Sequence, residues 1–233
     1  MSSKFKNRAY EEELMDDLTA GGPVIPQTLR ELETINKWLG GNYVTIDGIV
    51  KLIRRKSPQK LVIADLGCGG GDIIKLVARW AASKKLDVEL VGFDANPYII
   101  DYARENCKDF DNISFEVQDI FSDEFRQREF DIILCTLFTH HFTEEQLTEI
   151  FRQFKSQAKV GVVINDLHRH WFAFHSIHIL TSLFSKSEMV KNDASLSVLR
   201  SFKRSELVQL MKDAEIGWFS LKWMWAFRWQ LVF

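Results

Sequence analysis

This chain of 233 residues has few cysteines, no long apolar run and little net charge, and each of these shortages argues against a class of protein. Its three cysteines (Cys68, Cys107 and Cys135) lie far apart without paired metal-binding spacing, so we expect reduced, buried thiols. No window has the length and apolarity of a membrane span, and the polar N-terminus lacks a signal-peptide core. We therefore expect a cytoplasmic protein without stable membrane insertion. The net charge of −2 gives no electrostatic reason to expect a nucleic-acid partner.

The chain does have enough apolar sequence, 46% of its residues, for the core of one α/β domain with a modest addition. From Lys60 onward, segments with strand and helix patterns alternate, which is typical of a doubly wound, mostly parallel sheet. The expected strands cover residues 61–65, 88–94, 113–118, 130–134 and 160–166. The expected helices between them cover residues 73–83, 99–107 and 144–157.

The regions outside this alternation are expected to be helical additions and a closing strand pair. Upstream, helices are expected at residues 10–18, 28–39 and 47–55. Residues 167–202 break the alternation with a long aromatic and apolar stretch, and a helix at 205–214 and antiparallel strands at 221–225 and 227–233 follow. The prediction is a single domain of 1–233 with an N-terminal helical cap (1–57), a core (58–166 and 203–233) and a lid insert (167–202).

The most informative motif is KLVIADLGCGGGD, in which an apolar strand ends in Asp65 and a glycine loop leads into a helical pattern. Glycines remove side chains from the approach path of a ligand, and the following helix offers unpaired N–H groups. The spacing of Gly67, Gly69 and Gly71 does not fit a dinucleotide fingerprint, because the third glycine of that pattern would fall on Asp72. It resembles motif I of class I S-adenosylmethionine (SAM) methyltransferases. These enzymes have a Rossmann-like sheet of seven strands with an antiparallel strand near the C-terminus.

This resemblance implies SAM as the cofactor and assigns binding roles near successive strand ends. Asp65 would order the loop or contact the methionine amino group, and Asp94 would accept hydrogen bonds from both ribose hydroxyls. Asp119 would accept from the adenine amine. The other residues that we assign to the cofactor site follow these acids, lie in the glycine loop or end the fourth strand: Gly67, Cys68, Gly69, Gly71, Ala95, Ile120 and Thr136.

Two histidine clusters lie near strand ends that border the methyl-transfer region of such a fold. His141 and His168 are the candidates for a general base, because histidine can take a proton near neutral pH. The alternative is that His140 is a core histidine and that the loop at 168–170 hydrogen-bonds Asp166. No metal site is predicted, because the histidines of 168–178 lack a cysteine or second carboxylate at a recognisable spacing.

The acceptor is less defined by sequence than the cofactor. Residues 171–184 suit a lid over an aromatic or lipid-like small molecule, a membrane-surface helix or plain packing. The insert, with NDLHRH at 165–170 and SVLR at 197–200, resembles bacterial methyltransferases associated with type III polyketide synthases. That resemblance implies O-methylation of a phenolic or polyketide-type acceptor in secondary metabolism. C-methylation of a quinone or polyprenyl precursor and a non-catalytic SAM-binding regulator remain open, as does the oligomeric state.

Overall fold

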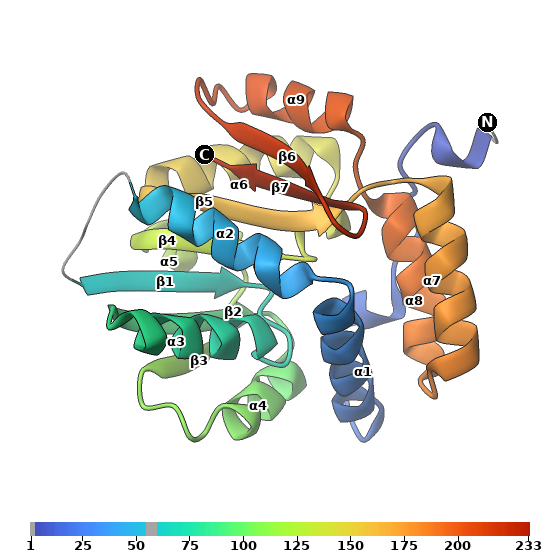
Figure 1. The fold of residues 1–233 in the computed structure, drawn as a ribbon, viewed down its shortest axis with the longest axis horizontal. Coiled ribbons are helices and arrows are strands. Elements are labelled where there is room, and N and C mark those ends of the chain that lie inside the picture. Colours follow the sequence, from blue (N-terminus) through green and yellow to red (C-terminus); the bar gives the residue numbers. More distant parts are fainter. Residues whose placement is uncertain (1–2, 55–59) are drawn as a thin grey trace.

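The computed structural model describes residues 3–54 and 60–233, and its centre is a seven-stranded sheet with the order β3-β2-β1-β4-β5-β7-β6 (Figure 1). The strands are β1 (Lys60–Leu66), β2 (Asp87–Asp94), β3 (Ile113–Val117), β4 (Phe130–Thr136), β5 (Ala158–Leu167), β6 (Ser220–Met224) and β7 (Arg228–Val232). The first five are parallel, β7 runs antiparallel to β5, and β6 runs antiparallel to β7. The predicted fold class is confirmed.

Helices cover both faces of the sheet and its carboxyl edge. The helices are α1 (Val24–Trp38), α2 (Gly41–Ile53), α3 (Asp72–Lys84), α4 (Pro97–Asn106), α5 (Asp123–Arg126), α6 (Glu144–Gln157), α7 (Trp171–Phe184), α8 (Glu188–Arg200) and α9 (Arg204–Asp213). One apolar cluster joins α2, α3 and α4 to one face, and another joins α5, α6 and α9 to the opposite face. Successive strand residues divide between these clusters, as Ile63 and Ala64 do, because strand side chains alternate.

Local chemistry fixes several of these boundaries. Asn96 accepts hydrogen bonds from the backbone of Tyr98 and Ile99 at the start of α4. Thr143 opens α6 with a capping box, in which its side chain accepts from the backbone N–H of Gln146. Gly40 separates α1 from α2 with a φ of 73°, a left-handed conformation that suits glycine. Helices α1 and α2 begin earlier than their patterns suggested, at Val24 and Gly41.

The expected helix over residues 10–18 is wrong. Only a short 3₁₀ turn, η2 (Leu14–Asp16), forms there. The backbone N–H groups of Leu14 and Met15 donate to the Asp193 carboxylate at 2.9 and 3.1 Å instead of continuing a helical ladder. Tertiary contacts with α8 therefore replace local helical hydrogen bonds. The end of the helix expected over 47–55 lies partly outside the described residues, where α2 is traced to Ile53.

Helices α1, α7 and α8 stand together beyond the carboxyl ends of the parallel strands (Figure 1). Ligands of doubly wound folds bind at this edge, where the strand order reverses between β1 and β4. Within residues 3–54 and 60–233, no helix combines the length and apolarity needed to cross a membrane.

Candidate functional site

A cavity of about 1310 Å³ opens at the carboxyl edge of the sheet. It exceeds the roughly 300–1,000 Å³ usual for one small ligand, so it can accommodate two. One side is formed by the glycine loop and the ends of β2, β3 and β4. The other side is formed by the N-terminal segment (residues 9–18), α1, α7 and α8, with apolar side chains that include Leu29, Phe172, Ile177, Leu180, Val190 and Val198.

The glycine loop needs its glycines for backbone conformation and for space. Gly67 has a φ of +65°, and a Cβ there would lie 2.2 Å from the ring of Phe138. Gly69 has a φ of +51°, and a Cβ there would meet only Leu29 at 3.7 Å. A larger residue at Gly67 would be strained and crowded, whereas Gly69 leaves the approach to the loop open.

Asp94 connects the end of β2 to this loop. Its carboxylate accepts hydrogen bonds from the backbone N–H of Gly69 at 3.3 Å and of Asn96 at 3.0 Å. Burial raises the pKa of Asp94, while these two hydrogen bonds oppose that rise. Asp119 follows β3, is exposed, and accepts from the backbone of Phe121 at 2.9 Å. Each carboxylate keeps further acceptor capacity toward a ligand, because a carboxylate has about four lone-pair positions.

Most residues assigned to the cofactor from the sequence lie on the wall of the cavity. These residues are Gly67, Cys68, Gly69, Asp94, Ala95, Asp119, Ile120 and Thr136. Asp65 and Gly71 lie off the wall, and Gly71 instead precedes α3 as its N-cap. Both candidate bases, His141 and His168, line the cavity.

Asp65 is buried beside the glycine loop with neither carboxylate oxygen hydrogen-bonded to a described residue. Burial, with smaller contributions from Asp72 and Asp94, raises its pKa to about 8. An unsatisfied buried acceptor costs free energy, so a donor that approached the loop would be favoured.

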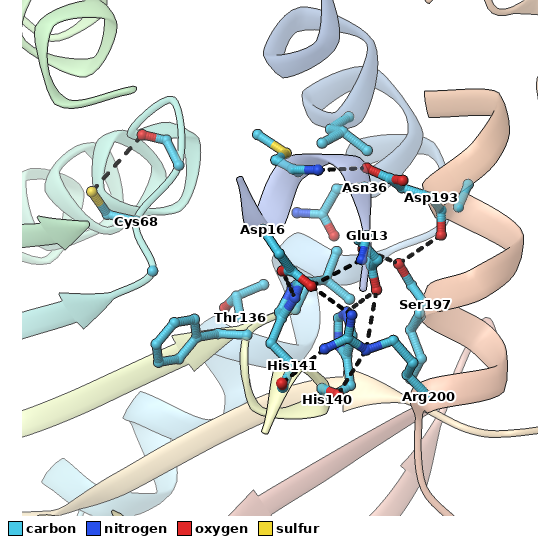
Figure 2. Close-up of a pocket in the computed structure, with 18 of the residues that line it drawn as sticks. Glu13, Asp16, Asn36, Cys68, Thr136, His140, His141, Asp193, Ser197 and Arg200 are labelled. Atoms are coloured by element: carbon cyan, nitrogen blue, oxygen red, sulfur yellow. Dashed lines mark hydrogen bonds and ion pairs between the residues drawn. The ribbon is translucent and has the colours of Figure 1, made fainter. Parts of the chain in front are cut away.

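His141 is held by an acid from the N-terminal segment. Its Nδ1 lies 2.6 Å from Asp16 Oδ1, and Asp16 Oδ2 accepts from Arg200 Nη1 at 2.6 Å. Burial would raise the pKa of Asp16, but the contacts with His141 and Arg200 hold it well below its usual range. Figure 2 shows Glu13 and Asp16 facing Arg200 of α8 and the two histidines that follow β4.

His140 lies behind His141 and is a buried core histidine, as one of the two interpretations of the sequence had it. Its Nδ1 lies 2.7 Å from Asp166 Oδ1, and its Nε2 lies 3.5 Å from Glu13 Oε1. Burial alone would lower the pKa of His140, but these carboxylates raise it to about 9. Ligand atoms of Glu13, His140 and His141 come within 4.8 Å of one another. Because both nitrogens of His140 already face carboxylates, these contacts favour an ion-pair network over a metal site.

His168 differs from His141 in its hydrogen-bond partner. Its Nδ1 accepts a hydrogen bond from the indole N–H of Trp223 at 3.2 Å. Burial, together with His170 and Arg169, lowers its pKa to about 4. The alternative of a loop bonded to Asp166 is wrong in detail, because Asp166 accepts from Thr139 and His140.

No sequence pattern indicates the partners that surround His140 and His141. Arg8 donates to the carbonyl oxygens of His140, Phe142 and Arg200, at 3.0, 2.9 and 2.6 Å. The only sequence signal was the run of acidic residues at 11–17, whose ordinary interpretation is a solvated helix. A contact such as Asp16 to His141 spans 125 positions, which no local pattern reveals.

Comparisons with known proteins agree with this geometry. Residues 58–216 match a family described as a methyltransferase domain. A carboxy-S-adenosyl-L-methionine synthase of Helicobacter pylori strain P12 is 25% identical over 184 residues, which are 74% of each chain.

Two solved structures share the fold at low sequence identity. The magnesium protoporphyrin IX methyltransferase of Synechocystis PCC 6803, solved with S-adenosylhomocysteine (SAH), has a TM-score of 0.54 at 15% identity, covering 83% of this chain and 82% of that one. Human N-acetylserotonin methyltransferase, solved with SAM, has a TM-score of 0.65 at 15% identity, covering 96% of this chain and 59% of that one.

The described residues fit an adenosyl cofactor on their own chemistry. The glycine cradle and the carboxylate of Asp94 supply space and acceptors along one side of the cavity, and the buried Asp65 beside the loop keeps both of its oxygens unpaired. With the family match covering more than half of its length, the chain belongs to the methyltransferase domain family and is a SAM-dependent methyltransferase.

Proposed function

We propose that this protein O-methylates a phenolic or polyketide-type small molecule, with His141 as the general base. The single observation that carries the proposal is the contact of His141 Nδ1 with Asp16 Oδ1 at 2.6 Å. A carboxylate only accepts, so Nδ1 carries the hydrogen and Nε2 keeps a lone pair in the neutral imidazole. No described residue pairs with Nε2, and His141 lines the cavity.

The same reasoning ranks His168 below His141. Because the indole N–H of Trp223 only donates, Nδ1 of His168 is an acceptor and its Nε2 carries the hydrogen. A pKa of about 4 also makes His168 a weak base. His168 therefore serves better as a neutral donor or packing residue.

The cofactor, when bound, supplies a methyl group on a positively charged sulfur that becomes the neutral leaving group SAH. Nε2 of His141 would take the proton of the acceptor hydroxyl, whose oxygen would receive the methyl group that the bound cofactor supplies. Asp16 stabilises the resulting imidazolium, and Arg200 holds Asp16 in place. The proton then passes from His141 to water when the cavity opens.

The apolar part of the cavity supports an aromatic or lipid-like acceptor. It includes Phe172, Ile177 and Leu180 of α7 and Val190 and Val198 of α8. We further propose that the cap of residues 1–57 and the insert of 167–202 act as a lid, which excludes water and aligns the hydroxyl with the methyl group. The resemblance of this insert to methyltransferases associated with type III polyketide synthases supports the same acceptor class.

The test is methyl transfer from isotope-labelled SAM to a panel of alkylated phenols and to their O-methyl ethers, which have no free phenolic hydroxyl. His141→Gln should lower kcat by about 10²–10⁴ at neutral pH while SAH affinity stays unchanged. His168→Gln, the matched control, should change kcat by less than about threefold. Equal loss in both variants would contradict the assignment of the base.

The product distinguishes the other functions. Label on a ring carbon would support C-methylation, and SAH binding without turnover would support a regulator. Conversion of SAM into a derivative that carries one additional carboxyl group would indicate the reaction for which the Helicobacter pylori relative is named.

A further inference from the structure

Arg228 is a buried cation that forms no ion pair with a described carboxylate, although the charge of Asp166 acts on it from beyond contact distance. It begins β7, opposite Leu167 at the end of β5, and lines the cavity while remaining 1% exposed. Its described hydrogen bond runs from Nη1 to Asn165 Oδ1 at 3.1 Å. Its Nε has no partner among the described residues.

The other buried arginines show how unusual this is within the same molecule. Arg8 pairs with Glu144 at 3.4 Å, Arg200 pairs with Asp16 at 2.6 Å, and Arg169 pairs with Glu206. Arg228 forms no ion pair with a carboxylate of the described chain. Burial lowers its pKa to about 10 against the opposing effect of the Asp166 carboxylate, which leaves Arg228 charged at neutral pH. Buried charges are costly unless they are paired, so the missing partner points to a ligand.

The surroundings hold the guanidinium in a fixed place. Asn165 donates from Nδ2 to the carbonyl oxygen of Gly41 at 2.8 Å and to Thr45 Oγ1 at 3.0 Å, which turns its Oδ1 toward Arg228. A Cβ at Gly41 would lie 2.9 Å from Arg228 Cζ and 1.8 Å from Asn36 Oδ1, so glycine is required for this packing. The Oδ1 of Asn36 is also buried without a partner and lies on the cavity wall.

A planar guanidinium anchored at one nitrogen can present its remaining N–H groups to a carboxylate as a two-pronged donor. We propose that Arg228 binds a carboxylate inside the cavity. The inference rests on the proposed function, because the carboxylate belongs either to the acceptor, which would then be a hydroxyaryl acid, or to the methionyl part of the cofactor.

The experiment compares wild type with Arg228→Gln by calorimetry, so it does not depend on turnover. One pair of probes is SAH and decarboxylated SAH, which keeps the amine and lacks only the carboxylate. The other pair is 4-hydroxycinnamate and its methyl ester, titrated into protein saturated with SAH. Arg204→Gln is the control, because it removes the same charge from an exposed position off the cavity.

If the carboxylate is the cofactor's, Arg228→Gln weakens SAH by about 10- to 100-fold and leaves decarboxylated SAH unchanged. If it is the acceptor's, SAH binding is retained, and the preference of wild type for the acid over its ester is lost by a similar factor. Arg228→Lys keeps the charge, and in either case should recover only part of the affinity.

Wild-type affinities for all four probes in Arg228→Gln would overturn the proposal. The proposal would also be overturned if the wild-type protein bound SAH no more tightly than decarboxylated SAH and the acid no more tightly than its ester. This comparison does not require Arg228→Gln to fold. A failed search for a base at His141 would leave these binding results unaffected, so the two proposals can fail separately.

Discussion

The two sides of the cavity are built in different ways. The side with the glycine loop comes from a contiguous motif and three strand ends. Its Gly67 and Gly69 belong to one short loop, and Asp94 joins that loop through a hydrogen bond of 3.3 Å. The acceptor side is assembled from segments that are distant in sequence, since Asp16, His141 and Arg200 come from the N-terminal segment, the β4 end and α8. The comparison shows that the proposed cofactor site is local in sequence, whereas the proposed site of methyl transfer depends on tertiary assembly.

The largest expected effect isolates the cofactor side. Asp94→Ala should weaken SAH binding by roughly 2–4 kcal/mol, because it would remove the two charge-assisted hydrogen bonds that we expect with the ribose. Calorimetry measures the change. The control is Asp101→Ala on α4, because Asp101 is an acidic residue that does not line the cavity. Equal SAH affinity in wild type and Asp94→Ala would mean that the ribose binds elsewhere.

A second effect concerns the core of the acceptor side. His140 has a folded pKa of about 9 against about 6.5 in the unfolded chain. Its protonation therefore stabilises the fold fully below about pH 6.5, and this stabilisation, on the order of 3 kcal/mol, is lost as the pH rises through 9. Urea unfolding between pH 6 and 10 should show the decline.

His140→Gln should flatten that decline. Burial raises the pKa of Asp65 to about 8, so Asp65 contributes to the same slope at its lower end, and the comparison of the two proteins isolates His140. A slope that is identical in wild type and His140→Gln would show that the imidazole is not protonated in the folded protein.

The smallest effect tests how the N-terminal segment is held. Ser197 Oγ donates to Glu13 Oε2 at 2.8 Å, and its loss in Ser197→Ala should destabilise the docked segment by about 1 kcal/mol. Hydrogen exchange should speed up in residues 9–18 while the glycine loop keeps its protection. Faster exchange in both places would remove the distinction between the two sides.

The same distinction explains what could be predicted from the sequence. The sheet, the glycine loop and the positions of Asp94 and Asp119 follow from strand patterns and local spacing. The irregular path of residues 10–18 could not be predicted in this way, because Leu14 and Met15 donate to Asp193, which is 178 or more positions away. The contacts of Asp16, Arg200 and Arg228 also depend on which side chains meet in space, so only the structure reveals them.

The most direct test of the central claim is a double-mutant cycle on kcat with Asp16→Asn and His141→Gln, using one phenolic acceptor under saturating SAM. If Asp16 acts by orienting His141, each single variant loses activity, and the double variant loses no more than His141→Gln alone. SAH affinity should be the same in all four proteins. Losses that multiply in the double variant would show that Asp16 and His141 act independently, and would contradict the account.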